Sequence, residues 1–241
     1  MSDKKLWDAL WARGEHLEWD PLSQEIYDTL MREWGGVTGK RVLEAGAGSG
    51  RISLRLAAAG AAVVLVDFSA EALFLARKNF QGRNLEAEYL LADITELPLP
   101  DHYVDFAWNA GVLEHLDYRG QVQALKEMKR VTRAGGLVVS FNPNARCLPY
   151  RVGKWAAECT GAWPYGAENP VASLAPVCQE AGLTLKKEYT IGLLAGLAFL
   201  DYVPNGRLVR AAAEAFLGQL PVEERGLFPG YLLVSVMSSE G

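Results

Sequence analysis

The chain has 241 residues, of which half are apolar, and a formal net charge of −5. This length and apolar content allow a substantial buried core, which favours a folded domain over a disordered chain. Because lysine and arginine form no basic stripe, nucleic-acid binding has no obvious electrostatic source, and RNA and DNA are not expected as substrates.

Three further features bound the function. The cysteines at 147, 159 and 178 are odd in number and lack C-x-x-C spacing, so we expect no disulfide framework and no metal site. The longest apolar run, residues 191–200, is about half of the ~20 residues that a membrane-spanning helix needs, so membrane insertion is not expected. The polar amino terminus lacks a signal-peptide pattern, which predicts a cytoplasmic protein.

Residues 1–39 are predicted to form a helical cap. Trp7 and Trp11 lie one turn apart on a first helix, and a second helix carries an apolar stripe that includes Ile26 and Trp34. Trp11 or Trp19 would line a binding site if these helices cover it. Simple core packing is the competing interpretation, since aromatic stripes mostly pack.

A glycine-rich turn follows the apolar run Arg41–Ala45 and leads into a helix that begins near Arg51. It reads Glu44-Ala-Gly-Ala-Gly-Ser-Gly50, with glycine at alternate positions, which leaves room for a ligand and permits unusual backbone angles. A dinucleotide-binding G-x-G-x-x-G pattern that starts at Gly46 would need glycine at 51, where arginine stands. An acid at position 44 would also repel a diphosphate, so a phosphate-free cofactor is favoured.

Two more apolar runs each end in an acid. The run at 62–66 ends in Asp67, which is placed to accept hydrogen bonds from ribose hydroxyls, a role that suits either a sulfonium nucleotide or NAD. The run at 87–92 ends in Asp93 and Ile94. Asp93 can contact a cofactor or can cap the turn that follows it.

A fourth strand is predicted at 104–108, followed by Asn109 and the segment Val112-Leu-Glu-His-Leu116. Val122, Leu125, Met128 and Val131 recur at helical spacing, and Gly135-Gly136 form a turn that leads into a fifth strand, residues 137–141. Residues 40–142 therefore form a core of alternating strands and helices.

These motifs, in this order, resemble the class I S-adenosylmethionine-dependent methyltransferases. The segment at 112–116 resembles the small-molecule group typified by ubiquinone and menaquinone biosynthesis, methyltransferase type 11. The resemblance implies a Rossmann-like α/β fold: a seven-stranded, mostly parallel sheet with its last strand antiparallel and helices on both faces. Asn109-Ala-Gly-Val replaces the Asn/Asp-Pro-Pro-aromatic tetrad of base-amino methyltransferases, which again argues against nucleic acid.

The resemblance also assigns cofactor roles, with S-adenosyl-L-methionine as methyl donor and S-adenosyl-L-homocysteine as product. It places Glu44, Ala45, Gly46 and Gly48 at the methionine portion, with Gly50 either there or in helix packing. Asp67 and Phe68 would lie at the ribose, Asp93 and Ile94 at the adenine, and Asn109 on the sulfonium side.

The acceptor site is expected to depend on two insertions, residues 143–170 and 192–220, within a single domain of 1–241. The first separates strand five from the next helix, and the second separates predicted strands at 184–190 and 231–237. The first insertion contains Arg146, Tyr150 and Tyr165, and we expect these residues and Trp19 to contact the substrate. This insertion can form a lid over an aromatic or acidic acceptor, or it can be a structured surface segment. The second would cover a pocket or form a subunit contact, so a monomer and a homodimer both remain open.

The predicted reaction is methyl transfer to the oxygen, nitrogen or activated carbon of a small, hydrophobic or aromatic acceptor. Aligning the two reactants and excluding water can suffice for this displacement, so a general base is not required. If a general base takes part, His115 is the first candidate. A non-catalytic S-adenosylmethionine-binding module shares every cofactor residue, and an NAD-dependent oxidoreductase shares Gly46, Gly48 and Asp67. The Asp93-Ile94 pair is unexplained by the NAD alternative.

Overall fold

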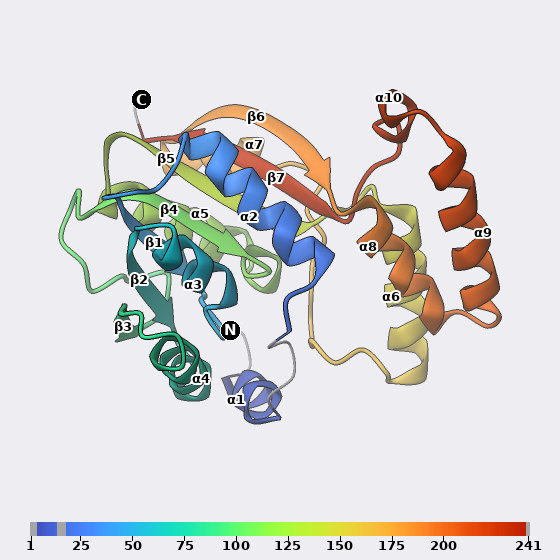
Figure 1. Cartoon of the computed structure of the whole chain (residues 1–241), viewed down its shortest axis with the longest axis horizontal. Helices are drawn as coiled ribbons and strands as arrows, with labels where there is room; N and C mark the ends of the chain where they lie inside the picture. The colour runs from blue at the N-terminus through green and yellow to red at the C-terminus, as the bar shows by residue number, and fades with distance from the viewer. Residues whose placement is uncertain (1–3, 14–17, 240–241) are drawn as a thin grey trace.

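The computed structural model describes residues 4–13 and 18–239 (Figure 1). The polar residues 1–3, used above to exclude a signal peptide, lie outside the described residues, as do 14–17 of the predicted cap and 240–241. The helices are α1 (Lys4–Ala12), α2 (Pro21–Trp34), α3 (Arg51–Ala58), α4 (Ala70–Gln81), η1 (Leu113–His115), α5 (Tyr118–Val131), α6 (Leu148–Thr160), α7 (Ala175–Ala181), α8 (Leu193–Leu197), η2 (Ala198–Tyr202), α9 (Gly206–Gln219) and α10 (Val222–Arg225). The strands are β1 (Arg41–Ala45), β2 (Ala62–Asp67), β3 (Glu88–Leu91), β4 (Val104–Ala110), β5 (Thr132–Pro143), β6 (Thr184–Ile191) and β7 (Leu232–Ser238).

The strands form one seven-stranded sheet in the order β3-β2-β1-β4-β5-β7-β6. Neighbours from β3 to β5 pair in parallel, whereas β7 is antiparallel to both β5 and β6. The predicted Rossmann-like fold with an antiparallel last strand is confirmed. Because β1, β2 and β4 are parallel, the segments that follow them all leave the same edge of the sheet, where ligands bind in open α/β folds.

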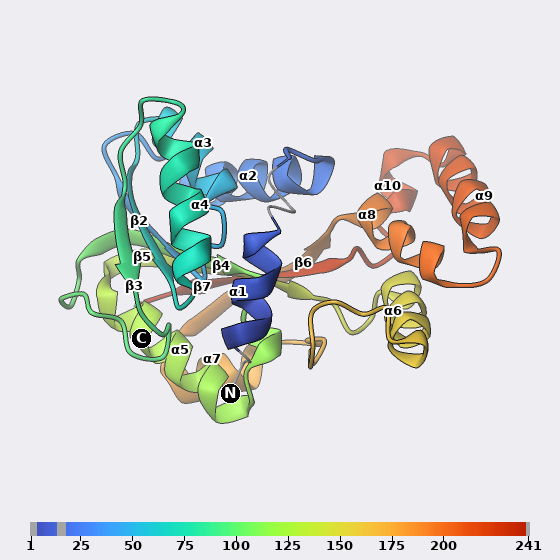
Figure 2. The ribbon, with the colours of Figure 1, turned by 90° about the horizontal axis from the view of Figure 1, so that it is seen from below.

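Alternate strand residues build two apolar layers, one on each face of the sheet. Leu43 and Ala107 pack beneath α5 and α7, while Val42 and Phe106 pack beneath α2, α3 and α4. Figures 1 and 2 show these helices on opposite faces. The near-continuous apolar runs in β1 and β2 therefore reflect burial on both faces.

Helices α6, α8, α9 and α10 with η2 gather at one end of the sheet, and we call this group the lobe (Figures 1 and 2). The lobe follows the carboxyl ends of β5 and β6 and precedes β7. The first predicted insertion thus contains a helix, α6, that the sequence analysis did not identify. Its buried side includes Gly153 and Lys154 while its exposed side carries Leu148 and Trp155, so the usual apolar periodicity is blurred.

No helix formed by the described residues is both long and apolar enough to cross a bilayer.

Candidate cofactor and acceptor site

A cavity of about 560 Å³ opens at the carboxyl edge of β1, β2 and β4, and side chains of α1 form part of its wall. Its wall comes from the glycine-rich turn, the ends of these strands, the β4–α5 connection, α1 and the 161–170 segment. The lining residues are Trp7, Leu10, Trp11, Ile26, Glu44, Gly46, Ala47, Gly48, Ser49, Arg51, Ile52, Asp67, Phe68, Asp93, Ile94, Thr95, Trp108, Ala110, Gly111, Val112, His115, Leu116, Asp117, Gly120 and Tyr165.

Two glycines of the turn allow close approach by other parts of the wall. Gly46 (φ +80°) and Gly48 (φ +52°) both adopt left-handed angles, and both line the cavity. A Cβ at Gly46 would lie 2.5 Å from Val112 Cγ2, and one at Gly48 would lie 2.6 Å from the Trp11 ring. Side chains at these positions would therefore push the cavity wall apart.

Gly50 serves packing in this structure. Its φ is +63°, and a Cβ there would meet Leu65 and Ala76, which belong to the core behind the turn. Neither Gly50 nor Ala45 is among the described residues that line the cavity. The packing alternative for the third glycine thus agrees with the geometry.

Glu44 brings a buried carboxyl group to the cavity wall. The side chain is only 6% exposed, and its Oε2 has no hydrogen-bond partner among the described residues. Burial raises the pKa of Glu44 to about 8, an effect that the nearby Arg51 guanidinium partly opposes. A buried acceptor without a donor is costly, so this site fits a ligand that carries a positively charged donor.

Asp67 lies at the end of β2 and is also buried. Its two carboxylate oxygens accept hydrogen bonds from the backbone N–H groups of Gly48 and Ser69, each at 2.8 Å. Burial raises the pKa of Asp67, while these backbone donors oppose the rise. Each oxygen can accept more than one bond, so Asp67 can hold the turn and still contact a ligand. Phe68, the next residue, lines the same cavity.

Asp93 lines the cavity and also caps a turn, so the capping expected from the sequence does not remove its carboxylate from the cavity wall. Its Oδ1 accepts hydrogen bonds from the backbone N–H (2.8 Å) and hydroxyl (2.7 Å) of Thr95. The neighbouring Ile94 is buried and presents an apolar surface to the cavity.

Asn109 does not line the cavity, which corrects the expected position of its side chain. Its Oδ1 accepts a 2.7 Å hydrogen bond from the Ser140 hydroxyl, and its amide lies 3.2 Å from Met128 Sδ beneath α5. Side chains alternate along β4, so Trp108 and Ala110 face the cavity while Asn109 points to the other face.

His115 lines the cavity at the end of η1. Its Nδ1 lies 2.9 Å from the Ala167 carbonyl oxygen, which can only accept, so Nδ1 carries the proton and Nε2 holds a lone pair. Burial lowers the pKa of His115, so the ring is neutral near pH 7. The edge of this ring packs against Trp7 of α1, with centroids 5.0 Å apart.

Glu114 lies behind His115 and is fully buried. Its Oε1 is 3.8 Å from His115 Nε2, and its Oε2 has no hydrogen-bond partner among the residues described. Burial raises the pKa of Glu114 well above its usual value.

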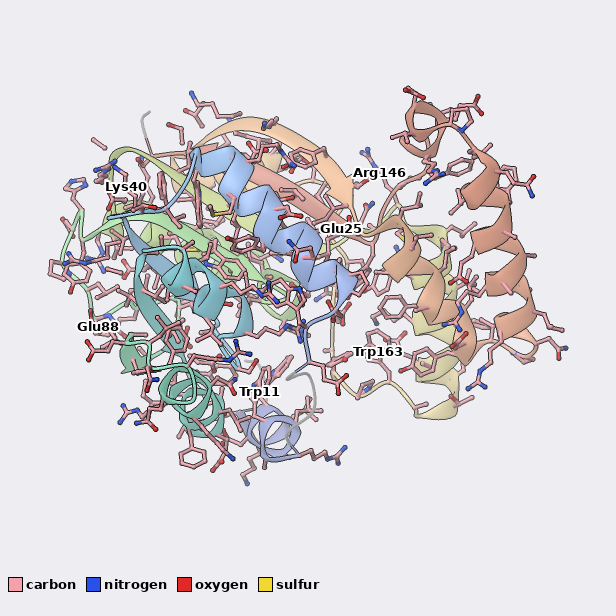
Figure 3. The ribbon with its side chains drawn as sticks, in the orientation of Figure 1. Trp11, Glu25, Lys40, Glu88, Arg146 and Trp163 are labelled. Carbon is pink, nitrogen blue, oxygen red and sulfur yellow. The ribbon has the colours of Figure 1, made fainter. Side chains whose placement is uncertain are left out.

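Of the four expected substrate contacts, only Tyr165 lines the cavity, where it stacks on Trp7 with centroids 6.4 Å apart. Trp19 instead lies under the Arg55 guanidinium on the outer side of α3. Arg146 is exposed where the lobe joins the sheet, away from Trp11 (Figure 3). Tyr150 is buried and donates a hydrogen bond to Glu168, because α6 turns it inward.

Sequence reasoning missed Trp7 and Arg51 as parts of this wall. Trp7 looked like one of a pair of packing residues, and nothing local shows that α1 crosses the cavity. Arg51 stood out only as the residue that breaks a dinucleotide pattern. Trp11, in contrast, was considered for the wall, and it does cover Gly48.

The described residues contain no group of histidine, cysteine and acidic side chains that could hold a metal ion.

Comparisons with known proteins agree with this geometry. The family model described as "Methyltransferase domain" matches residues 43–140. A probable S-adenosylmethionine-dependent methyltransferase of Mycolicibacterium smegmatis is 30% identical over 215 residues, which cover 88% of this chain and 77% of that protein. A malonyl-[acyl-carrier protein] O-methyltransferase of Pseudescherichia vulneris is 33% identical over 136 residues, 56% of this chain; the match spans about half, 52%, of that protein.

Among solved structures, geranyl diphosphate C-methyltransferase of Streptomyces coelicolor, in complex with S-adenosyl-L-homocysteine, has a TM-score of 0.62. The superposition covers 90% of this chain and 79% of that one, at 15% sequence identity, so it supports the fold alone. The sequence resemblance stated above is confirmed by the relatives. The chain belongs to the S-adenosylmethionine-dependent methyltransferases.

Proposed function

We propose that this methyltransferase acts on a small aromatic or hydrophobic acceptor that lies against Trp7, Tyr165 and His115. The observation that carries the proposal is the continuity of the cavity. One end holds Glu44, Asp67 and Asp93, and the same cavity reaches the stacked rings of Trp7 and Tyr165. Stacked aromatic walls bind flat, apolar molecules well.

The cofactor residues fit the parts of S-adenosylmethionine. Glu44 would receive the ammonium group of the methionine portion, and Arg51, which lines the cavity beside it, would receive the carboxylate. Asp67 would accept from the ribose hydroxyls and Asp93 from the adenine amino group, with Ile94 against the ring. This pairing of one acid with one base suits a zwitterion.

The charges of the wall favour a neutral or cationic acceptor over an acidic one. Four acids, Glu44, Asp67, Asp93 and Asp117, line the cavity, whereas Arg51 is the one lysine or arginine among its described lining residues. Arg146, an expected substrate contact and a cation of the first insertion, is exposed and does not line the cavity. The proposed acceptor is therefore a small molecule such as a phenol or an amine. Nucleic acid is not proposed as a substrate.

The reaction needs alignment, exclusion of water and an outlet for one proton. When bound, S-adenosylmethionine supplies an electrophilic methyl group. Trp7 and Trp11 cover the cavity and limit water. His115 Nε2 would accept the acceptor's proton, because its Nδ1 proton is held by the Ala167 carbonyl and the ring is neutral.

Calorimetric titration with S-adenosylmethionine, S-adenosylhomocysteine and NAD tests the cofactor assignments. We expect both sulfur nucleotides to bind and NAD not to bind. Asp67→Ala and Asp93→Ala should each weaken binding by roughly 10-fold or more, because each removes a charge-assisted hydrogen bond.

Thr95→Val is the matched control for Asp93. It removes a hydroxyl that bonds to Asp93 and leaves the carboxylate in place, so affinity should stay within about threefold of the wild type. Unchanged affinity in Asp93→Ala would contradict the adenine assignment. Nucleotide binding without turnover of any phenol or amine in a broad screen would favour the non-catalytic binding module.

A further inference from the structure

A short stretch of chain, which we call the 165–169 segment, borders the cavity beside His115. Tyr165 lines the cavity, and the Ala167 carbonyl oxygen lies 2.9 Å from His115 Nδ1. A carbonyl oxygen can only accept a hydrogen bond, so Ala167 determines which nitrogen of the ring carries the proton. The state of His115 therefore depends on where this segment lies.

The next two residues attach the segment to two other parts of the chain. The Asn169 N–H donates a 2.8 Å hydrogen bond to the carbonyl oxygen of Glu114 in η1. The Glu168 carboxyl group accepts a hydrogen bond from the hydroxyl of Tyr150 in α6. The segment is thus held between η1, which carries His115, and the lobe.

Glu168 anchors the segment on the lobe side. It is the only buried residue of the 165–169 segment, and Ala167 and Asn169 on either side of it are exposed. Tyr150, its partner, is fully buried. A buried carboxyl group and a buried hydroxyl group are each costly without a hydrogen bond, so their bond to each other fixes Glu168 against α6.

The charges around Glu168 allow a neutral side chain to take its place. Burial raises the pKa of Glu168, while the Tyr150 hydrogen bond and the Lys154 ammonium oppose the rise. Lys154 also forms an ion pair with Glu158 of its own helix, so it keeps a partner if Glu168 loses its charge. Glutamine, which matches the size of Glu168 and offers an amide oxygen, can therefore accept the same hydrogen bond from Tyr150.

We propose that Glu168 is a positioning residue for His115. Its hydrogen bond to Tyr150 holds the 165–169 segment against α6. This keeps the Ala167 carbonyl on His115 Nδ1 and leaves Nε2 unprotonated, and the inference rests on the proposed function in which Nε2 takes the proton of the acceptor. Glu114 Oε1 is 3.8 Å from Nε2, which is beyond hydrogen-bond distance, so it does not occupy this lone pair.

Nuclear magnetic resonance of the full chain with isotope-labelled histidine tests the proposal. Nitrogen shifts distinguish a ring protonated on Nδ1 from one protonated on Nε2, and His115→Asn assigns the signal of His115. The wild type should show His115 protonated on Nδ1. Glu168→Ala and Tyr150→Phe should each shift the tautomer equilibrium roughly 10-fold towards the Nε2-protonated ring, an effect equivalent to one hydrogen bond.

Three controls separate positioning from a general loss of structure. Glu168→Gln should keep the wild-type tautomer. Asp201→Asn removes a 3.0 Å ion pair with Arg210 elsewhere in the lobe and should also leave the tautomer unchanged. His102 is an internal reference, because its Nδ1 lies 3.2 Å from the Thr132 carbonyl oxygen at the opposite end of β5, and it should stay protonated on Nδ1 in every variant.

The outcomes distinguish this proposal from the proposed function. His115 that stays protonated on Nδ1 in both Glu168→Ala and Tyr150→Phe would overturn the positioning role, provided that each variant still binds S-adenosylhomocysteine and is therefore folded. An equal shift in Glu168→Gln and Glu168→Ala would also overturn it. If His115→Asn methylates phenols or amines at the wild-type rate, the proposed base is wrong, and a tautomer shift would then support the positioning role alone.

Discussion

The proposed contact between Glu44 and the ammonium group of the cofactor predicts that cofactor binding releases a proton. Its pKa of about 8 means that the carboxyl group is mostly protonated at pH 7 in the free protein. An ammonium group placed against Oε2 favours the ionised form, so binding should release close to one proton at pH 7. Affinity should therefore rise about 10-fold per pH unit below pH 8 and level off above it.

Calorimetry of S-adenosylhomocysteine binding in buffers of different ionisation enthalpy measures this proton directly. The matched variant is Glu44→Gln, which keeps the size of the side chain but has no proton to lose. It should bind more weakly with no proton release. Proton release that persists in Glu44→Gln would show that another group titrates and would remove Glu44 from this role.

Helix α1 packs over the glycine-rich turn with Trp11, whose ring would lie 2.6 Å from a Cβ at Gly48. Trp11→Ala should weaken S-adenosylhomocysteine binding by about 10-fold, because an aromatic part of the cavity wall is lost. Gly48→Ala should weaken it further, since the new methyl group would displace Trp11 and the backbone is left-handed. In the Trp11→Ala background only the backbone cost remains, so the two losses should be less than additive.

Gly39→Ala is the control for the backbone cost. Gly39 has a similar φ of +72°, but a Cβ there meets no described atom within 4 Å. The Gly39→Ala variant should bind the nucleotide with unchanged affinity, while its free energy of unfolding should fall by about 1 kcal/mol. Simple additivity of Gly48→Ala and Trp11→Ala, measured by calorimetry, would show that Trp11 does not depend on Gly48.

Elements also differ in how far the sequence could predict them. The strands of the core were recognisable because apolar runs end in acids or glycines, and Glu44, Asp67 and Asp93 consequently lie at one edge. The position of the Asn109 side chain was predicted wrongly because β4 is apolar on both faces. Its sequence therefore does not show which residues point to which face of the sheet. The path of α1 over the cavity depends on contacts between distant segments, such as the 2.6 Å hydrogen bond from Ser69 to Asp8, which no local pattern reveals.

Buried acids should determine how the stability of the whole protein depends on pH. Burial raises the pKa values of Glu44, Glu114 and Glu168, so these groups stay protonated in the folded chain above the usual carboxyl range. The unfolded chain ionises them near pH 4.5, and unfolding then releases protons. The free energy of unfolding should fall as pH rises from about 4.5 through the folded pKa values, by about 1.4 kcal/mol per group and pH unit.

Groups whose pKa is lower in the folded chain than in the unfolded chain reduce the free energy of unfolding at low pH. Burial lowers the pKa of His115, so the unfolded chain binds the proton first, and stability is lost as pH falls from about 6.5 to the folded pKa. Burial would raise the pKa of Glu33, but hydrogen bonds from Lys187 and Tyr189 outweigh burial and lower it. Its contribution to stability is therefore lost as pH falls from about 4.5 to its folded pKa. We therefore expect greatest stability in mildly acidic solution.

Glu114→Gln isolates the contribution of one buried acid, which lies beside His115. The variant cannot ionise, so its stability relative to the wild type should rise by about 1.4 kcal/mol per pH unit from pH 5 until the pH passes the raised folded pKa of Glu114, whatever constant packing cost glutamine adds. Chemical denaturation across this range measures the difference. Glu33→Gln serves as the control: because Glu33 is ionised throughout in the folded chain, its difference from the wild type should stay constant. A constant difference for Glu114→Gln as well would mean that Glu114 is ionised in the folded protein, despite its burial.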